Sequence, residues 1–314
     1  MKISLRRGFT FIELLFVIVI LGIVGGIALE AIRLYYEGIY RTQTYTQRVN
    51  EADHILDQLS KYFENAIDMS IVNLDQDKVD AALDGGNCAE PGIEADQATA
   101  HDYTVAFLGV DVDSLRTGSI PGWSEQPIIN FTVPLAPTLT SNDANFTAAD
   151  NVIKALYPAS SLAESVIYNH QGLVGSCSHF NWDASGGLQG YYPITGATIH
   201  NLSLTNPGGG DDGSQKYLIR TGYAFRVLDT GDFMMYSNFR PWKIPAEPYT
   251  GGKTSILGRD VASFYADFNN TNSYGDRGSI WRLKVCMRGL ESNLSTSDIA
   301  ASAICRERKV HVRY

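Results

Sequence analysis

Hydrophobic and polar residues follow two different patterns in the first 70 residues of the chain. From Phe9 to Leu29 the sequence is apolar on every helical face, and Glu13 is the one charged residue in this run. At about 1.5 Å per residue, a helix over 9–29 is about 31 Å long, close to the thickness of the hydrocarbon core of a bilayer. The run therefore predicts a transmembrane helix over 9–29.

Beyond Glu30 the pattern becomes amphipathic. Apolar residues recur at spacings of three and four with charged residues between them, namely Val49, Ala52, Ile55, Leu56, Leu59, Phe63, Ala66 and Ile67. This is the period of a helix with one buried stripe, which we place within 30–70. Because no proline precedes Pro91, we expect one long helix from Phe9 to Ile67. Two helices joined near Gly38 are the alternative.

The remaining residues, 71–314, have the composition of strands and loops, and all eleven prolines lie there. Two apolar runs, 222–228 and 233–239, flank Asp229-Thr230-Gly231-Asp232 and predict a β-hairpin. Other β-branched and aromatic runs predict strands at 103–112, 128–133, 152–157, 165–168, 255–268, 280–287 and 309–314. Polar segments predict loops at 73–102, 137–150 and 206–214. We expect an α+β fold in which a long N-terminal helix packs on an antiparallel β-rich head.

The residues around the start of the apolar run predict an orientation and a partner. Lys2, Arg6 and Arg7 precede it, so the leader is expected in the cytoplasm and the body outside it. A carboxylate inside an apolar helix costs about 2.5–3.5 kcal/mol, so Glu13 suggests a partner. If the chain were cut after Gly8, the new amine of Phe9 in a neighbouring copy could meet Glu13 and set the register between helices.

These residues resemble the type IV prepilin signal: a short basic leader, Gly8, an aromatic residue, and then Thr10-Phe11-Ile12-Glu13-Leu14 at the start of an apolar helix. The resemblance implies that a prepilin peptidase removes the leader 1–8 by cutting between Gly8 and Phe9, and that it methylates the amine of Phe9. It implies that Glu13 is the glutamate used in assembly. It also implies a pilin-like head, and partners among other pilins or pseudopilins and an inner-membrane assembly platform.

The order of elements is also similar to that of larger minor members of this family, the J-type pseudopilins and W-type minor pilins. The likeness lies in the segment Ile55–Ile67, in the spacing of Leu257, Val261 and Phe264, and in a late strand near Trp281. It implies a minor pilin or pseudopilin of a type IV pilus or type II secretion pseudopilus, held in the inner membrane by one helix with a periplasmic head. The polar loops 73–102 and 134–150 motivate an alternative, a tip adhesin or DNA-uptake recognition module.

Two other interpretations of the N-terminus stay open. Gly26-Ile27-Ala28 is a small-x-small triplet at which a secretory signal peptide could be cleaved. The early charge of Glu13 and the length of the apolar run argue against that interpretation. A plain signal anchor, in which Glu13 has no assembly role, is the second alternative.

The four cysteines, Cys88, Cys177, Cys286 and Cys305, all lie in the part expected to be exported, where disulfides form. Three pairings are possible. Cys286 and Cys305 are close in sequence and flank a polar loop, so we expect them to pair, which leaves Cys88 with Cys177.

Two groups of loop residues have side chains that can bind a metal ion. Cys177 and His179 form a C-x-H pair with His170 nearby, a spacing that matches no standard zinc pattern. Asp211 and Asp212 follow three glycines and carry the hard oxygen ligands that Ca²⁺ prefers, although glycine–aspartate loops are usually turns. A structural Ca²⁺ is therefore the one cofactor that the sequence suggests.

Composition and motifs argue against other functions. The formal net charge of −9 argues against a nucleic-acid-binding face spread over the whole surface. The sequence contains no G-x-S-x-G, H-E-x-x-H or G-x-x-x-x-G-K-[ST] motif, so an anchored enzyme has no motif in its support. We expect a non-enzymatic filament subunit.

Overall fold

The computed structural model describes residues 11–75, 88–89, 103–112, 128–130, 132, 136–141, 144–158, 160–169, 180–182, 191–205, 216–243, 246–268, 279–289 and 303–312. The chain divides into two compact units, Met1–Asn50 and Glu51–Tyr314. The helix α1 (Phe11–Phe63) contributes to both, and the described strands all belong to the second unit.

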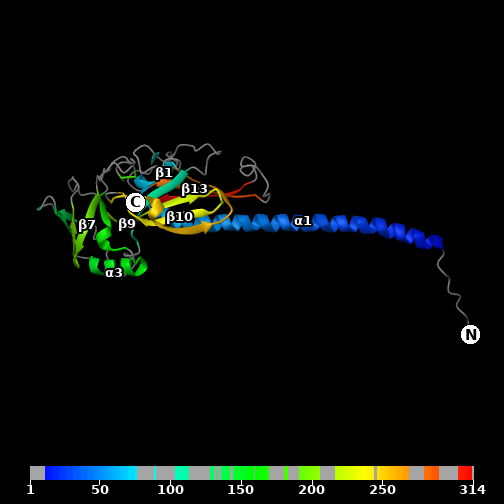
Figure 1. Ribbon diagram of the computed structural model, residues 1–314, viewed down its shortest axis with the longest axis horizontal. Coiled ribbons are helices and arrows are strands. Elements are labelled where there is room, and N and C mark those ends of the chain that lie inside the picture. Colours follow the sequence, from blue (N-terminus) through cyan, green and yellow to red (C-terminus); the bar gives the residue numbers. More distant parts are fainter. Residues whose placement is uncertain are drawn as a thin grey trace, which may run out of the picture. The chain divides into compact units, whose positions relative to one another are not determined.

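The helix α1 is continuous, as expected from the absence of proline (Figure 1). The alternative of two helices joined near Gly38 is wrong, since the hydroxyl of Thr42 donates a 2.9 Å hydrogen bond to the carbonyl of Gly38 within an unbroken helix. The helix ends at Phe63, before the expected end at Ile67. Its last turn tightens there, because the amide of Ala66 bonds the carbonyl of Phe63 at 3.0 Å.

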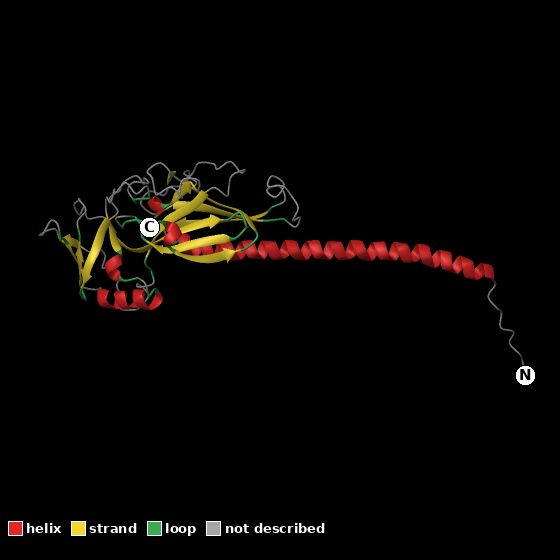
Figure 2. Ribbon diagram, in the orientation of Figure 1, coloured by secondary structure: helices red, strands yellow, loops and turns green. Residues whose placement is uncertain are grey.

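The strands of the larger sheet pair antiparallel throughout. Figure 2 draws the described strands as yellow arrows. Their order across the sheet is β2 (Cys88–Ala89), β1 (Val72–Asp75), β3 (Tyr103–Val110), β9 (Lys216–Val227), β6 (Val166–Asn169), β7 (Tyr191–Ala197), β8 (Asn201–Leu204), β5 (Thr138–Thr140) and β4 (Ile128–Asn130). The later part of β9 also pairs with β10 (Phe233–Phe239), which in turn pairs with β11 (Lys253–Gly258). The long strand β9 is thus the one on which this sheet branches.

A smaller sheet holds β12 (Val261–Phe268), β13 (Ser279–Met287) and β14 (Ile304–Val312) in that order. Three short 3₁₀ helices also lie among the described residues, at Asp68–Ser70, Leu162–Glu164 and Tyr249–Gly251. All pairings of the smaller sheet are antiparallel, so the predicted α+β class with an antiparallel β-rich head is confirmed.

The end of α1 packs between residues of both sheets. The predicted apolar stripe is buried from Ala52 onward, whereas Val49 is only half-buried. Its buried helical members are Ala52, Ile55, Leu56, Leu59 and Phe63. The Phe63 ring is fully buried, with its centroid 4.7 Å from that of Phe107 on β3 and 6.4 Å from that of Trp281 on β13. Each such side chain contributes about 1.5–3 kcal/mol by leaving water. This stripe therefore fastens the helix to the head.

The predicted hairpin is confirmed as β9 and β10, joined through Asp229–Asp232. Gly231 has φ +89°, which only glycine adopts without strain. The first strand is longer than expected because it extends back to Lys216, where it pairs with β6. The strand predicted at 165–168 is confirmed as β6.

The strand predicted at 152–157 is wrong, because residues 152–156 belong to the helix α3 (Phe146–Leu156) and Tyr157 follows its last turn. The side chain of Asn145 caps this helix by accepting a 2.9 Å hydrogen bond from the amide of Ala148. Phe146, Ala149 and Ile153 are buried at helical spacing. The expected loop 137–150 accordingly contains β5 and the first turn of α3.

The single strand expected over 255–268 is in fact two strands of different sheets. β11 ends at Gly258 and pairs with β10, whereas β12 begins at Val261 and pairs with β13. Asp260 between them has φ +57°, a left-handed conformation that turns the chain. The alternation continues across the turn, so periodicity alone did not reveal the break.

Other expected boundaries were also wrong. β1 and β2 lie in the expected loop 73–102, and the last strand begins at Ile304 instead of 309. β7 and β8 were not expected, since β7 contains Pro193 and Gly196, which weaken a strand signal. The expected loop 206–214 lies outside the described residues.

Candidate functional site

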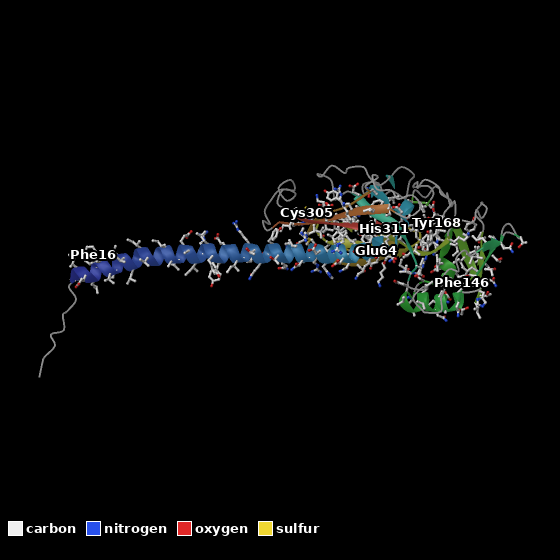
Figure 3. All side chains as sticks on the ribbon, turned by 180° about the vertical axis from the view of Figure 1, so that it is seen from behind. Phe16, Glu64, Phe146, Tyr168, Cys305 and His311 are labelled. Atoms are coloured by element: carbon white, nitrogen blue, oxygen red, sulfur yellow. A yellow bond between two sulfur atoms is a disulfide. The ribbon has the colours of Figure 1, made fainter. Side chains whose placement is uncertain are left out.

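The first part of α1 is apolar and exposed on all sides. Phe11, Phe16 and Leu29 expose 77%, 64% and 70% of their surface, and Figure 3 shows side chains standing out around this helix. None of the most apolar part of this helix is buried within the chain. By length and composition α1 can cross a membrane, and among the described helices it is the one that can.

Glu13 is the one acid among these residues, and it lies in the first described turn of α1. Its side chain is exposed, with apolar residues before and after it. An acid in the first turn of a helix interacts favourably with the helix dipole, by about 0.3–1 kcal/mol at an exposed site. Gly8 and Phe9 lie outside the described residues, so cleavage, methylation and the role of Glu13 in assembly stay predictions.

After the apolar run, α1 carries polar side chains that support the helix locally. Arg33 and Glu37 form an ion pair of 3.0 Å at i,i+4 spacing. The hydroxyls of Thr44 and Thr46 donate to the carbonyls one turn back at 2.9 Å each. Four tyrosines are exposed between these positions, namely Tyr35, Tyr36, Tyr40 and Tyr45. This stretch needs no contact with the head to satisfy its backbone.

Two ion pairs join the last part of α1 to the strand β14. Arg306 forms a two-atom contact with the carboxylate of Asp53 at 3.1 and 3.2 Å. Arg308 bonds Asp57 one turn later. Side chains two residues apart on a strand lie on one face, and side chains four apart on a helix do too, so the two pairs align. The two ion pairs connect the polar face of the amphipathic part of α1 to β14.

The predicted disulfide between Cys286 and Cys305 is confirmed. The two residues lie directly opposite each other on β13 and β14, with Cα atoms 4.0 Å apart. The predicted pairing of Cys88 with Cys177 falls outside the described residues, because Cys177 and the side chain of Cys88 are not among them.

The candidate metal ligands lie outside the described part of the chain as well. These are Asp211 and Asp212 for Ca²⁺, and the alternative zinc set of Cys177, His179 and His170. Within the ranges that the structure describes, no three His, Cys, Asp or Glu side chains gather where a metal ion could bind. The Ca²⁺ hypothesis thus stays a prediction.

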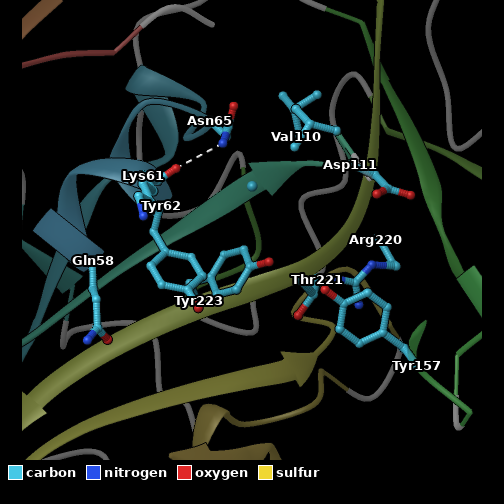
Figure 4. Close-up of a pocket in the computed structure, with 12 residues that line it drawn as sticks. Gln58, Lys61, Tyr62, Asn65, Val110, Asp111, Tyr157, Arg220, Thr221 and Tyr223 are labelled. Carbon is cyan, nitrogen blue, oxygen red and sulfur yellow. Dashed lines mark hydrogen bonds between the residues drawn. The ribbon is translucent and has the colours of Figure 1, made fainter. Parts of the chain in front are cut away.

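A groove in the head was not anticipated from the sequence. It contains a cavity of about 390 Å³ lined by residues from the end of α1, the end of β3, the residue after α3, and β9 (Figure 4). In its lining the guanidinium of Arg220 lies over the ring of Tyr157, 3.5 Å from the ring centroid. These residues are far apart in sequence and match no motif, so no sequence signal points to them.

Residues 3–29 match the family model of the prokaryotic N-terminal methylation motif. No curated protein and no solved structure matches the chain. The matched residues include Gly8, Phe9 and Glu13 and the apolar run through Leu29.

The match supports a type IV pilin- or pseudopilin-like subunit, anchored by its N-terminal helix. It also implies processing by a prepilin peptidase and assembly with other pilins. Proteins of this kind are structural and not enzymatic.

Proposed function

We propose that this protein is a minor pilin or pseudopilin, a structural subunit of a type IV pilus or of a type II secretion pseudopilus. One observation carries the proposal: the methylation motif over 3–29 includes the first part of α1, which is apolar and exposed on every face. The large β-rich head favours a minor subunit over a major one. The order of helix, hairpin and late strands supports a likeness to the J-type and W-type members.

The exposed apolar helix gives the physical reason for assembly. A helix that is apolar all round must be surrounded by lipid or by other apolar helices. Cleavage after Gly8 would leave the helix anchored in the inner membrane with the head in the periplasm, as the basic leader indicates. Moving such a helix out of lipid is favourable only into a bundle of similar helices, which is what the core of a filament supplies.

Glu13 and the amine of Phe9 would set the register of that bundle. An isolated carboxylate in an apolar setting is costly, and a cationic amine from the adjacent subunit removes much of this cost. Methylation keeps the positive charge of the amine, so the processed Phe9 remains a partner for Glu13.

The first test is the N-terminus and intact mass of the chain extracted from membranes. A chain that begins at methylated Phe9 is the expected result. A chain that begins at Met1 in a host with an active prepilin peptidase would indicate a plain anchor. A chain that begins near Leu29 would indicate a cleaved signal peptide, and the filament proposal would then be wrong.

The second test is the substitution Glu13→Ala, with Glu30→Ala as its matched control. Both glutamates are exposed on α1, but Glu13 alone lies within the matched apolar run. We expect Glu13→Ala to remain in the membrane and to enter filaments at least tenfold less, because the charge pair of about 2 kcal/mol or more is lost. Glu30→Ala should assemble normally. Equal assembly of the two variants by immunogold microscopy would remove the charge pair from the proposal.

A further inference from the structure

We propose that the groove beside Arg220 binds an acidic saccharide, a sugar that carries a carboxylate, with Arg220 as the partner of the carboxylate. The groove is formed by residues of the second unit, and the proposal does not depend on the filament function. Its ligand would add a recognition function to a subunit that is otherwise structural.

The groove consists of two adjoining cavities. The first, of about 390 Å³, reaches from Gln58 and Lys61 to Asp111. The second, of about 340 Å³, reaches from Pro158 to Lys253 on β11. Four residues line both cavities, namely Tyr62, Tyr157, Arg220 and Tyr223. Each cavity is of the size that small-molecule sites have, and together they form a groove for more than one ring.

Arg220 is the buried cation of the described lining, which also includes the buried residues Asp111 and Thr221. It exposes only 4% of its surface, and its Nε and Nη1 atoms have no hydrogen-bond partner among the described residues. Leaving buried donors unpaired costs about 1–3 kcal/mol each, and more for a charged group. The planar guanidinium matches a carboxylate, which can accept two parallel hydrogen bonds. Nε and Nη1 lie on different edges of the guanidinium, so a carboxylate on one edge and a sugar hydroxyl on the other would supply the missing acceptors.

Irregular strand pairing places Arg220 in this position. Gly109 and Val110 of β3 pair with Thr221 and Ile219 of β9, so Arg220 is the extra residue of a β-bulge. The bulge also reverses the faces of β9. Ile219 and Phe225 are six positions apart, so in a regular strand they would share a face, yet they pack in different core clusters. As the extra residue of the bulge, Arg220 does not follow the alternation of β9, and its side chain lines the groove.

A second bulge borders the groove on the opposite side of β9. Ser237 and Phe239 of β10 pair with Tyr223 and Gly222, so Asn238 is the extra residue there. Asn238 has φ +62°, a left-handed conformation uncommon outside glycine. Its amide donates to the hydroxyl of Thr221 at 2.7 Å, which holds the bend. Bulges are frequent beside functional sites, where they direct side chains toward a ligand.

The charge of the groove favours an anion. Its described lining holds three cations, Arg220, Lys61 and Lys253, against one acid, Asp111. Lys61 and Lys253 are exposed, so they can reach a ligand from the two ends of the groove. A net positive groove on a chain of formal charge −9 attracts anions selectively.

The neutral lining favours a sugar over a simple anion. Three tyrosine rings are half-buried in the groove, and the centroids of Tyr62 and Tyr223 lie 5.2 Å apart. Amide and hydroxyl groups surround them, from Gln58, Asn65, Asn238, Thr221 and Ser237. Burial raises the pKa of Tyr223, so its hydroxyl keeps its proton and remains a donor. Rigid aromatic faces with adaptable polar groups fit a ring that carries hydroxyls.

The experiment is calorimetric titration of the full-length chain in non-ionic detergent with trisaccharides. The probes are galacturonate, mannuronate and guluronate trimers, and the controls are a neutral galactose trimer and a hexaglutamate peptide. We expect at least one uronate trimer to bind, with the neutral trimer at least tenfold weaker. No uronate binding at millimolar concentration, equal binding of the neutral trimer, or tighter binding of the peptide would overturn the proposal.

Variants locate the binding. Arg220→Gln should weaken uronate binding at least tenfold, and Arg220→Lys, which keeps the charge without the fork, at least threefold. The matched control is Arg226→Gln on the same strand, which does not line the groove and should bind as the wild type does. Since a buried substitution can disturb folding, Lys253→Gln at an exposed position supplies a second test, with a two- to fivefold loss expected. Unchanged binding in both Arg220→Gln and Lys253→Gln would place the sugar elsewhere.

Discussion

The two parts of α1 contrast in how their apolar side chains are used. From Phe11 to Leu29 the helix is apolar on every face, and no part of its most apolar window is buried within the chain. From Ala52 to Phe63 the helix is apolar along one stripe, and that stripe is buried against the strands. A single helix thus carries one segment whose partners are in the same chain and one whose partners are outside it.

Both segments of α1 are hydrophobic, and they differ in whether their apolar side chains are exposed or are buried in the head. Phe16 and Phe63 are the same residue type in the same helix, yet one exposes 64% of its surface and the other none. The apolar surface of the first segment is far larger than isolated exposed residues provide, and such a surface indicates a lipid or protein partner. The following predictions test this contrast.

The largest expected effect is that of Phe63→Ala. Removing the buried ring leaves a cavity between Phe107, Phe225 and Trp281, and we expect the free energy of unfolding of the head to fall by about 3–5 kcal/mol. Phe16→Ala should change it by less than about 0.5 kcal/mol. Urea unfolding of the full-length chain in detergent, followed by near-UV circular dichroism, measures both. Similar losses in the two variants would contradict the contrast.

Loss of the disulfide is expected to be the next largest effect. The double variant Cys286→Ser with Cys305→Ser removes a link between residues separated by 19 positions, and we expect a loss of about 3 kcal/mol. The same unfolding assay applies, while retention in the membrane after carbonate washing should be unchanged. A loss of membrane retention would mean that the head contributes to anchoring.

Alkaline pH is expected to destabilise the head. Burial raises the pKa of Tyr168, Tyr191 and Tyr223 above the usual value of about 10, so the folded chain holds these protons more tightly than the unfolded chain. Their stabilising effect is complete below pH of about 10 and is lost as the pH rises, by about 1.4 kcal/mol per pH unit for each residue. Stopped-flow absorbance at 295 nm should show these tyrosines ionising only as the head unfolds. Their ionisation in the folded head near pH 10 would disagree with this expectation.

The smallest effect is expected from the ion pairs between α1 and β14. Arg306→Ala removes the contact with Asp53, in which the two side chains expose 48% and 38% of their surfaces. Because solvent screens such pairs, the head should lose no more than about 1 kcal/mol, and less at high salt. Arg33→Ala, which removes the pair with Glu37 in the first unit, should not change head stability. A loss above about 2 kcal/mol for Arg306→Ala would show that the pair is more than a surface contact.

Local sequence patterns predicted those elements whose residue types and spacing are typical of one kind of secondary structure. The unbroken α1 follows from the absence of proline, its buried stripe from three- and four-residue spacing, and the hairpin from the turn at Gly231. Helix α3 and strand β7 were missed, because Val152 and Ile153 read equally well as strand or helix and Pro193 weakens a strand signal. The break at Asp260 was also missed, since alternation continues across it. For β7 and for the break at Asp260, pairing with distant strands outweighed local propensity, whereas α3 is a helix with a cap at Asn145.

The sequence by itself determined the membrane-type helix, the methylation motif and the amphipathic stripe, because each depends on residues close together in the chain. It also indicated the pairing of Cys286 with Cys305 through their proximity. Only the tertiary structure decided that strand 255–268 divides between two sheets, and that Arg220 meets Tyr157 in a groove between two β-bulges. Bulges and sheet order arise from contacts between residues far apart in sequence, and no local pattern encodes those contacts.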